Sequence, residues 1–588
     1  MDKLSQRIAN FSPWLFRRLS NRQFLMFGAV AVGLWAGLSA VALKSVVHYL
    51  QVMLTNLGKT YGWIYIVSPV IGILLTVLFI KYVLKGELVK GTSHVMLAIA
   101  RRASLLPRKE IYAHLTTSAL TVGMGGSAGL ESPIVQTGSA IGSVFSSFFP
   151  VGYRDRTLLL ACGAAAGIAT AFNAPIAGVL FALEVLLVDI NISAFIPLLI
   201  AGATGSLCST VILSEEIPLS FREVTPFNYR NLPFYILLGF FCGLISAYYL
   251  RVFARLETMF KRIFKSPYSK FIGGSVMLVI LIAIVPALFG EGYTSIVALA
   301  RTRPSALFAG SPLQSFLHAN SNLWGPAILG VAMVKVFAVS LTLNAGGNGG
   351  NFAPSLLVGA CVGFAFAFTG NSFELTHLPV ANFCLVAMAG VLTGIFHSPL
   401  TAIFLIAEIT GGYGLIIPLM LVSALSTAVS KYLNPLSLDE AKLQQNGTRY
   451  FGRDMYIVSG LTLEGCIEKD FISVELGDSL RKLTEAVARS RRNVFPVLDK
   501  AGMLAGVISL EEIREIMFDT TRHDVVRVEQ LMQKPVAVAE ISDDMHSVIE
   551  KFDRTGVWNI PVLDAGRYLG FVSKSRVLSN YREKLRGE

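Results

Sequence analysis

Two copies of one glycine and proline pattern constrain what this 588-residue chain can fold into. The pattern Gly129, Pro133, Gly138 and Gly142 recurs 221 residues later as Gly350, Pro354, Gly359 and Gly363. Corresponding interrupted segments in two halves of a chain indicate an internal repeat, with a substrate site where the halves meet. A second pair of segments, Asn173–Glu184 and His397–Glu408, belongs to the same repeat, because each places a proline nine residues before a glutamate.

Long stretches without Asp, Glu, Lys or Arg place this repeat in a membrane. A helix needs roughly 20 apolar residues to cross a bilayer, and each of these stretches is long enough. Many contain glycine, proline or asparagine, which favours broken or tilted helices buried against protein rather than straight spans. We therefore predict an all-α polytopic membrane domain built as an inverted repeat. The uncharged stretches are residues 157–183, 190–214, 336–373 and 375–407.

The distribution of charge divides the chain into two parts. Residues 1–440 hold 28 Lys and Arg against 16 Asp and Glu, whereas residues 441–588 hold 22 of each sign. The net charge of +12 thus belongs to the membrane part and its flanks, and it does not indicate a nucleic-acid partner. We expect Glu291–Trp324 to be the longest loop of the membrane part that does not cross the membrane. The predicted organisation is a cytoplasmic segment at 1–24, a membrane domain at 25–440, a linker at 441–453 and two α/β domains at 454–520 and 521–588.

Glu131 is the most informative charged residue of the membrane part. Pro133 follows it, and proline is favoured at the first positions of a helix, so Glu131 is predicted at a helix N-terminus. Helix N-termini attract anions, so this carboxylate is a tethered anion that competes with a free one. Glu184 and Glu408 fit structural acids better than proton relays. A cation carrier would need several carboxylates facing one cavity, and the uncharged stretches leave mainly these three.

The C-terminal part contains a repeat of its own. Asn493–Asp499 recurs as Asn559–Asp564, and each copy is followed by glycine, two hydrophobic residues and serine. This arrangement resembles a tandem pair of CBS domains, which commonly sense adenine nucleotides. Ser509 and Glu512 fit the hydroxyl and the ribose-binding acid of the first domain. In the second domain Ser573 is followed by Arg576 where the acid would stand, so a dimerisation module without ligand is an equal alternative.

The membrane part resembles the CLC family of chloride channels and proton/chloride exchangers. Gly129–Pro133 resembles the family's Gly-x-Glu-x-Pro motif, and Gly350–Pro354 resembles its Gly-x-Phe-x-Pro motif. The resemblance implies a homodimer with one anion pathway per subunit, in a bacterial inner membrane, with the CBS domains in the cytoplasm. It implies a transport protein rather than an enzyme, with no required cofactor and with an adenine nucleotide as a candidate ligand of the CBS pair. Chloride is the expected anion, and nitrate and bicarbonate stay open.

The resemblance also assigns candidate site residues. Glu131 corresponds to the external gating glutamate, whose protonation lifts the carboxylate out of the path, so acid pH is expected to raise the flux. The backbone N–H groups of Asn351 and Phe352 would coordinate the central anion. Thr92, with Ser93 beside it, aligns with the hydroxyl donor of the first motif, and Ser437 aligns with the family's central tyrosine.

Two questions stay open at the level of sequence. Val185 stands where exchangers often carry an internal proton-transfer glutamate, which favours channel-like passive conduction over proton/chloride exchange. Gly125–Gly129 also fits the Gly-x-Ser-x-Gly pattern of a serine hydrolase. A hydrolase would need a strand before the serine and a partner histidine, and the sequence indicates neither.

Overall fold

The computed structural model describes residues 20–60, 62–86, 88–101, 104–187, 192–213, 221, 225–373, 377–445 and 461–587. The chain divides into two compact units, Met1–Tyr450 and Phe451–Glu588. Residues 1–19 of the predicted N-terminal segment, 446–453 of the predicted linker and 454–460 of the predicted first CBS domain lie outside the described residues.

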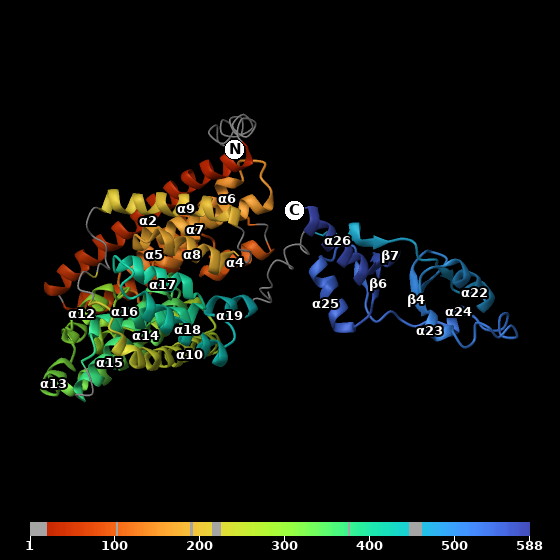
Figure 1. Ribbon diagram of the computed structural model, residues 1–588. Helices are drawn as coiled ribbons and strands as arrows, with labels where there is room; N and C mark the ends of the chain where they lie inside the picture. The colour runs from red at the N-terminus through yellow and green to blue at the C-terminus, as the bar shows by residue number, and fades with distance from the viewer. Residues whose placement is uncertain are drawn as a thin grey trace. The chain divides into compact units, whose positions relative to one another are not determined.

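The first unit is helical throughout its described ranges, where nine helices are long and apolar enough to cross a membrane. Figure 1 shows α2 running alongside α9, and α2 also packs on α7. The predicted all-α membrane domain is confirmed. The helices of its first half are α2 (Asn21–Thr60), α3 (Gly62–Tyr82), α4 (Thr92–Arg101), α5 (Lys109–Gly123), α6 (Glu131–Ser146), α7 (Tyr153–Phe172), α8 (Pro175–Phe181), the π-helical turn η1 (Ala182–Leu186) and α9 (Ile192–Leu213).

The second half repeats this succession of long and interrupted helices. The predicted loop Glu291–Trp324 is wrong in detail, because it contains α12, α13 and two 3-10 helices that pack on the unit. The elements of this half are η2 (Tyr229–Asn231), α10 (Leu232–Ile263), α11 (Pro267–Ile284), η3 (Pro286–Leu288), α12 (Tyr293–Ala300), η4 (Pro304–Phe308), α13 (Gln314–Ala319), η5 (Ser321–Leu323), α14 (Trp324–Asn344), α15 (Phe352–Ser372), α16 (Val380–Phe396), α17 (Pro399–Ile409), α18 (Ile416–Leu433) and α19 (Leu438–Gln445).

The breaks between helices have the same local cause in both halves. Asn173 ends α7 and His397 ends α16 in left-handed backbone conformations, with φ of 51° and 55°. A left-handed residue commonly ends a helix, and proline suits the first position of the next one. Pro175 and Pro399 accordingly begin α8 and α17. These breaks turn the chain at equivalent points of the repeat.

Glycines allow the helices of each half to approach backbone to backbone. A Cβ built on Gly138 of α6 would lie 2.2 Å from the Gly163 carbonyl oxygen of α7. In the second half, a Cβ on Gly363 of α15 would lie 2.2 Å from the Phe383 carbonyl oxygen of α16. Small residues at helix contacts are typical of membrane helices, which gain stability from close packing. The repeated glycines therefore hold the same helix pair together in each half.

The second unit consists of two small sheets with helices. The strands β2 and β3 pair in parallel and β3 and β4 antiparallel, and β5, β6 and β7 repeat this pattern. The short strand β1, which precedes the first repeat, pairs antiparallel with β7 and adds a fourth strand to the sheet of the second repeat. The predicted α/β character is confirmed. The elements are α21 (Leu463–Cys466), β1 (Ile467–Glu468), β2 (Val474–Glu475), α22 (Leu480–Arg489), β3 (Val494–Leu498), β4 (Leu504–Ser509), α23 (Leu510–Ile513), α24 (Val528–Leu531), β5 (Ala539–Glu540), α25 (Met545–Thr555), β6 (Asn559–Asp564), β7 (Arg567–Ser573) and α26 (Lys574–Gly587).

Candidate functional site

The two copies of the glycine and proline pattern meet at their helix N-termini. The Gly129 N–H donates to the Gly350 carbonyl oxygen at 2.9 Å, and the Gly350 N–H donates to the Gly129 carbonyl oxygen at 2.7 Å. This reciprocal pair places the start of α6 beside the start of α15. A side chain on Gly350 would lie 2.7 Å from the Ser132 Cβ, so the approach requires glycine. Two electropositive helix ends thus converge on one point of the membrane domain.

Glu131 occupies that point. It is the first residue of α6 and its side chain is buried, with 3% of the residue exposed. Its Oε2 accepts a hydrogen bond from the Ala353 N–H in the first turn of α15 at 3.3 Å. Its Oε1 accepts a hydrogen bond from the Tyr293 hydroxyl. The carboxylate therefore accepts from a backbone amide in the first turn of α15, which is a position that suits an anion.

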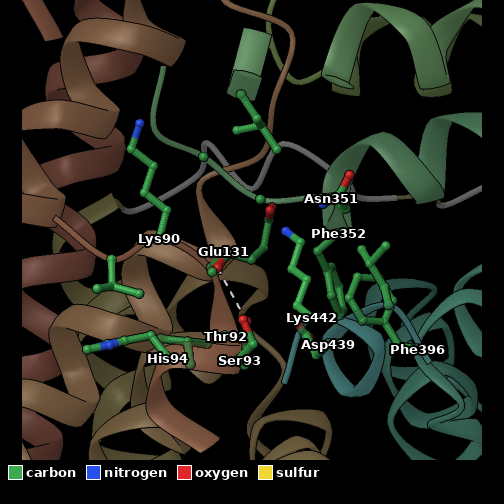
Figure 2. A pocket seen from close by; sticks show the side chains of 18 of the residues that line it. Lys90, Thr92, Ser93, His94, Glu131, Asn351, Phe352, Phe396, Asp439 and Lys442 are labelled. Carbon is green, nitrogen blue, oxygen red and sulfur yellow. Dashed lines mark hydrogen bonds between the residues drawn. The ribbon is translucent and has the colours of Figure 1, made fainter. Parts of the chain in front are cut away.

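A cavity of about 240 Å³ reaches Glu131. Figure 2 shows Glu131 above Thr92 and Ser93, with Lys442 and Phe352 to their right, and all five residues line the cavity. The Thr92 hydroxyl lies 3.3 Å from the Ser132 hydroxyl, next to Glu131. The cavity thus presents hydroxyl groups, helix-terminal amides and a carboxylate together. Its charged lining residues are Lys90, Glu131, Glu257, Lys261, Asp439 and Lys442.

An apolar wall of phenylalanine rings borders the same cavity. Phe181, Phe352 and Phe396 line it. The centre of the Phe352 ring lies 5.6 Å from the centre of the Phe396 ring, 5.6 Å from that of Phe172 and 6.4 Å from that of Phe181. Beside these rings an anion would meet ring edges and helix-terminal amides, whereas Lys90, Lys261 and Lys442 in the same lining carry full positive charges. The ring edges and amides would attract an anion without forming an ion pair with it.

The structure brings most of the predicted anion ligands together. Thr92, Ser93, Asn351 and Phe352 line the cavity with Glu131. The Asn351 side chain is held by the Tyr249 hydroxyl, which donates to its Oδ1 at 2.9 Å.

Ser437, the remaining candidate anion ligand, immediately precedes α19 (Leu438–Gln445). It caps α19, because its N–H donates to the Glu440 carboxylate at 2.8 Å and its hydroxyl accepts from the Glu440 N–H at 3.4 Å. The next residue, Leu438, lines the cavity, whereas Ser437 is not among the lining residues. A direct anion contact of Ser437 stays a prediction.

Glu291 and Lys44 near Glu131, and Lys335 near Glu291, were not identified as site residues from the sequence. Glu291 accepts a hydrogen bond from the Leu130 N–H at 3.3 Å, and Lys44 lies close enough to both carboxylates to interact electrostatically. Lys335 is fully buried and donates to the Gly290 carbonyl oxygen at 3.0 Å. Each is a single charge beside or within a long apolar stretch. That isolation is the signal that marks intramembrane charges as functional candidates.

The serine of the hydrolase pattern lacks the context that such an enzyme needs. Ser127 lies between helices α5 and α6, whereas a nucleophile elbow places the serine after a strand. Its buried hydroxyl accepts a hydrogen bond from Lys335 Nζ at 2.8 Å. This contact ties α14 to the loop before α6, which is a structural role.

Glu184 and Glu408 cap each other's helices across the repeat. The Glu184 carboxylate accepts from the N–H groups of Leu400 at 3.2 Å and Thr401 at 2.9 Å, in the first turn of α17. The Glu408 carboxylate accepts from the N–H groups of Ile176 at 3.0 Å and Ala177 at 2.9 Å, in the first turn of α8. Helix N-termini favour such carboxylates. The contacts match the structural role expected for both acids.

We predict that Glu408→Ala lowers the free energy of unfolding without changing the pH dependence of transport. The substitution leaves the N–H groups of Ile176 and Ala177, which are partly buried, without their charged acceptor, a loss of about 2 kcal/mol. Thermal unfolding of the purified protein in detergent measures the first effect, and anion efflux from proteoliposomes between pH 4.5 and 7.5 measures the second. An altered pH profile with an unchanged unfolding temperature would contradict this assignment and give Glu408 a role in transport.

The CBS candidates also act as helix caps. The Ser509 N–H donates to the Glu512 carboxylate at 3.1 Å, and the Ser509 hydroxyl accepts from the Glu511 N–H at 3.3 Å. The Ser573 hydroxyl accepts from the Arg576 N–H at 3.1 Å. Both serines thus begin the helix that follows the last strand of their repeat. Their contacts with a nucleotide stay predictions.

A helical membrane domain in which two repeated helix N-termini meet at a buried carboxylate has the architecture of an ion-transport protein. The family model described as voltage gated chloride channel matches residues 71–431, more than half of the chain. The CBS domain model matches residues 464–519 and 528–583. The chain therefore belongs to the CLC family of chloride channels and transporters and carries a tandem CBS pair.

Individual relatives agree with this assignment. The chloride channel protein CLC-f of Arabidopsis thaliana is 28% identical over 454 residues, which cover 68% of this chain and 56% of that protein. The H(+)/Cl(-) exchange transporter ClcA of Klebsiella pneumoniae is 27% identical over 435 residues, covering 72% of this chain and 88% of that protein. The crystal structure of a slow cyanobacterial Cl-/H+ antiporter matches with a TM-score of 0.62 at 22% identity, over 73% of this chain and 98% of that one. The last likeness concerns the fold alone.

Proposed function

We propose that this protein carries chloride or a similar small anion across a membrane, along a path that Glu131 closes. The observation that carries the proposal is the position of the Glu131 carboxylate on the Ala353 N–H at the start of α15. A free anion suits the same helix N-terminus, so the carboxylate and the anion compete for it. Protonation removes the charge of Glu131, and the carboxyl group then leaves the position to the anion.

The lining of the cavity supports an anion as substrate. The N-terminal amides of α15 and the hydroxyls of Thr92, Ser93 and Ser132 are donors, and the phenylalanine rings exclude water. Asn351 and Phe352 would hold the central anion through their backbone N–H groups, with Thr92 as a further donor. Chloride fits this set, because it needs several weak donors and no fixed geometry. Nitrate and bicarbonate are tested in the same flux measurement.

We further propose that conduction is passive and not coupled to protons. Val185 is partly buried in η1, and its aliphatic side chain has no titratable group that could carry a proton. The neighbouring acid, Glu184, accepts hydrogen bonds from Thr401 in the first turn of α17, which fits a helix-capping role. Proton/chloride exchange is the second candidate, because relatives such as ClcA of Klebsiella pneumoniae are named exchange transporters.

The reversal potential in reconstituted bilayers tests this choice. Under a tenfold chloride gradient we expect a reversal potential of about 59 mV, as for any passively conducted monovalent ion. A superimposed proton gradient should leave that value unchanged. A shift with the proton gradient would establish coupled exchange and would require a proton route that avoids Val185.

Two further proposals follow from family membership. The protein is expected to be a homodimer in a bacterial inner membrane with its CBS pair in the cytoplasm, and cross-linking in native membranes tests the dimer.

The CBS pair is expected to bind an adenine nucleotide that modulates the flux. Addition of ATP to proteoliposomes tests this, since an unchanged flux and unfolding temperature would leave the pair a structural module.

A further inference from the structure

Tyr293 lies opposite Glu131, at the first residue of α12. Gly292 before it adopts a left-handed conformation with φ of 96°, which few other residues accept. A Cβ on Gly292 would lie 2.6 Å from the Leu357 side chain of α15. Glycine at this position therefore lets α12 begin directly against α15. The backbone thereby fixes the place of Tyr293 beside the N-terminus that holds the Glu131 carboxylate.

The ring of Tyr293 packs on Phe172, which itself contacts the phenylalanine wall of the cavity. Phe172 packs edge-on against the Tyr293 ring with 6.4 Å between ring centres, and Phe172 also packs on Phe352. The hydroxyl is the only polar group of this side chain, and it donates to Glu131 Oε1. A hydrogen bond to an ionised acceptor is roughly twice as strong as one between neutral groups. The hydrogen bond from Tyr293 therefore stabilises the ionised form of Glu131 in this position more than the protonated form.

The other charged groups around Glu131 do not replace this contact. Lys44 on α2 donates to the Ala171 carbonyl oxygen, and Glu291 accepts from the Leu130 N–H. On α4 and α5, His94 lies 3.3 Å from the Glu110 carboxylate and His114 lies 3.4 Å from the Asn348 side chain.

We infer that Tyr293 is a positioning residue that holds the Glu131 carboxylate in the closed position, so that its hydrogen bond sets the pH at which anion flux begins. This inference rests on the proposed function. In the closed state the ionised carboxylate accepts from the Tyr293 hydroxyl and the Ala353 N–H. Protonation of Glu131 weakens both contacts, and the side chain is released from the path.

The test replaces Tyr293 by phenylalanine in the full-length protein and measures chloride efflux from proteoliposomes between pH 4 and 8. The substitution keeps the ring and removes the donor to the carboxylate. We expect the pH of half-maximal flux to rise by about one unit, which makes the flux near neutral pH about tenfold higher. The maximal flux at acid pH should stay the same. Tyr248→Phe is the matched control, because it removes a hydroxyl that donates to the Met333 carbonyl oxygen at 3.2 Å, outside the site.

Repeating Tyr293→Phe in a Glu131→Gln background separates the possible outcomes. A shift that disappears in this background supports the inference. A wild-type pH profile for Tyr293→Phe, with a pH dependence that Glu131→Gln removes, overturns the role of Tyr293 and leaves the proposed function standing. A flux that falls equally at every pH in both backgrounds indicates a merely structural tyrosine and also overturns it. If Glu131→Gln itself changes nothing, the proposed function fails.

A second substitution keeps the inference testable if the phenylalanine variant does not fold. A ring-fluorinated tyrosine incorporated at position 293 preserves the shape of the side chain and makes its hydroxyl a stronger donor. The pH of half-maximal flux should then fall below that of the wild type. An unchanged or higher value would overturn the inference.

Discussion

Glu131→Gln is expected to remove the pH dependence of anion flux and to hold the flux near neutral pH at the level that the wild type reaches in acid. Glutamine has nearly the shape of glutamate but no charge, so it binds the α15 amide and the Tyr293 hydroxyl more weakly. Hydrogen bonds to a charged group contribute about 1.5–3 kcal/mol each, so the neutral-pH flux should rise about tenfold or more. Chloride efflux from proteoliposomes at pH 4.5 and 7.5 measures the effect.

The matched control for this variant is Asp155→Asn. Asp155 lies in the first turn of α7, and its carboxylate accepts a hydrogen bond from the Asn21 side chain at 3.2 Å. It does not line the cavity, so its neutralisation should leave the pH profile of the wild type. A Glu131→Gln protein with unchanged flux and unchanged pH dependence would show that Glu131 does not close the path.

Gly138→Val is expected to abolish the folded membrane domain. The first atom of the new side chain would lie 2.2 Å from the Gly163 carbonyl oxygen, and backbone of a packed helix pair cannot move aside as a flexible side chain does. Overpacking costs about 1–3 kcal/mol even where side chains can adjust, and occasionally more. We expect loss of the monodisperse peak in size-exclusion chromatography and a lower unfolding temperature of any protein that remains.

The repeat supplies both a second test and a control. Gly359 is the equivalent of Gly138 in α15, and a Cβ there would lie 2.5 Å from the Met388 Cα of α16, so Gly359→Val should have the same effect. A Cβ on Gly330 in α14 would have no atom within 4 Å, so Gly330→Val should fold like the wild type. Normal folding of Gly138→Val would contradict the close packing of α6 on α7.

The sequence was sufficient where a local property of the chain decides the structure. The prolines at 133, 175, 354 and 399 restrict the backbone and mark helix starts, and the repeated glycines mark the close helix pairs. Proline is favoured in the first turn of a helix, so a carboxylate just before Pro133 is expected near a helix N-terminus, whichever helices surround it. For the same reason family membership and the CBS pair could be inferred from short motifs alone.

The partners of Glu131 could not be inferred in this way. Tyr293 lies 162 residues further along the chain, in a segment expected to be a loop, and only the packing of α12 on α15 brings its hydroxyl to the carboxylate. The position of the Ser437 hydroxyl could not be inferred either, because its hydrogen bonding with Glu440 in a helix cap competes with exposure to the cavity. Sequence patterns were enough to predict the broken membrane helices, the repeat and the buried acid, since each follows from backbone restriction and hydrophobicity over a few residues. The tertiary structure alone decided which groups hold that acid, because those contacts join segments whose approach depends on the packing of the whole domain.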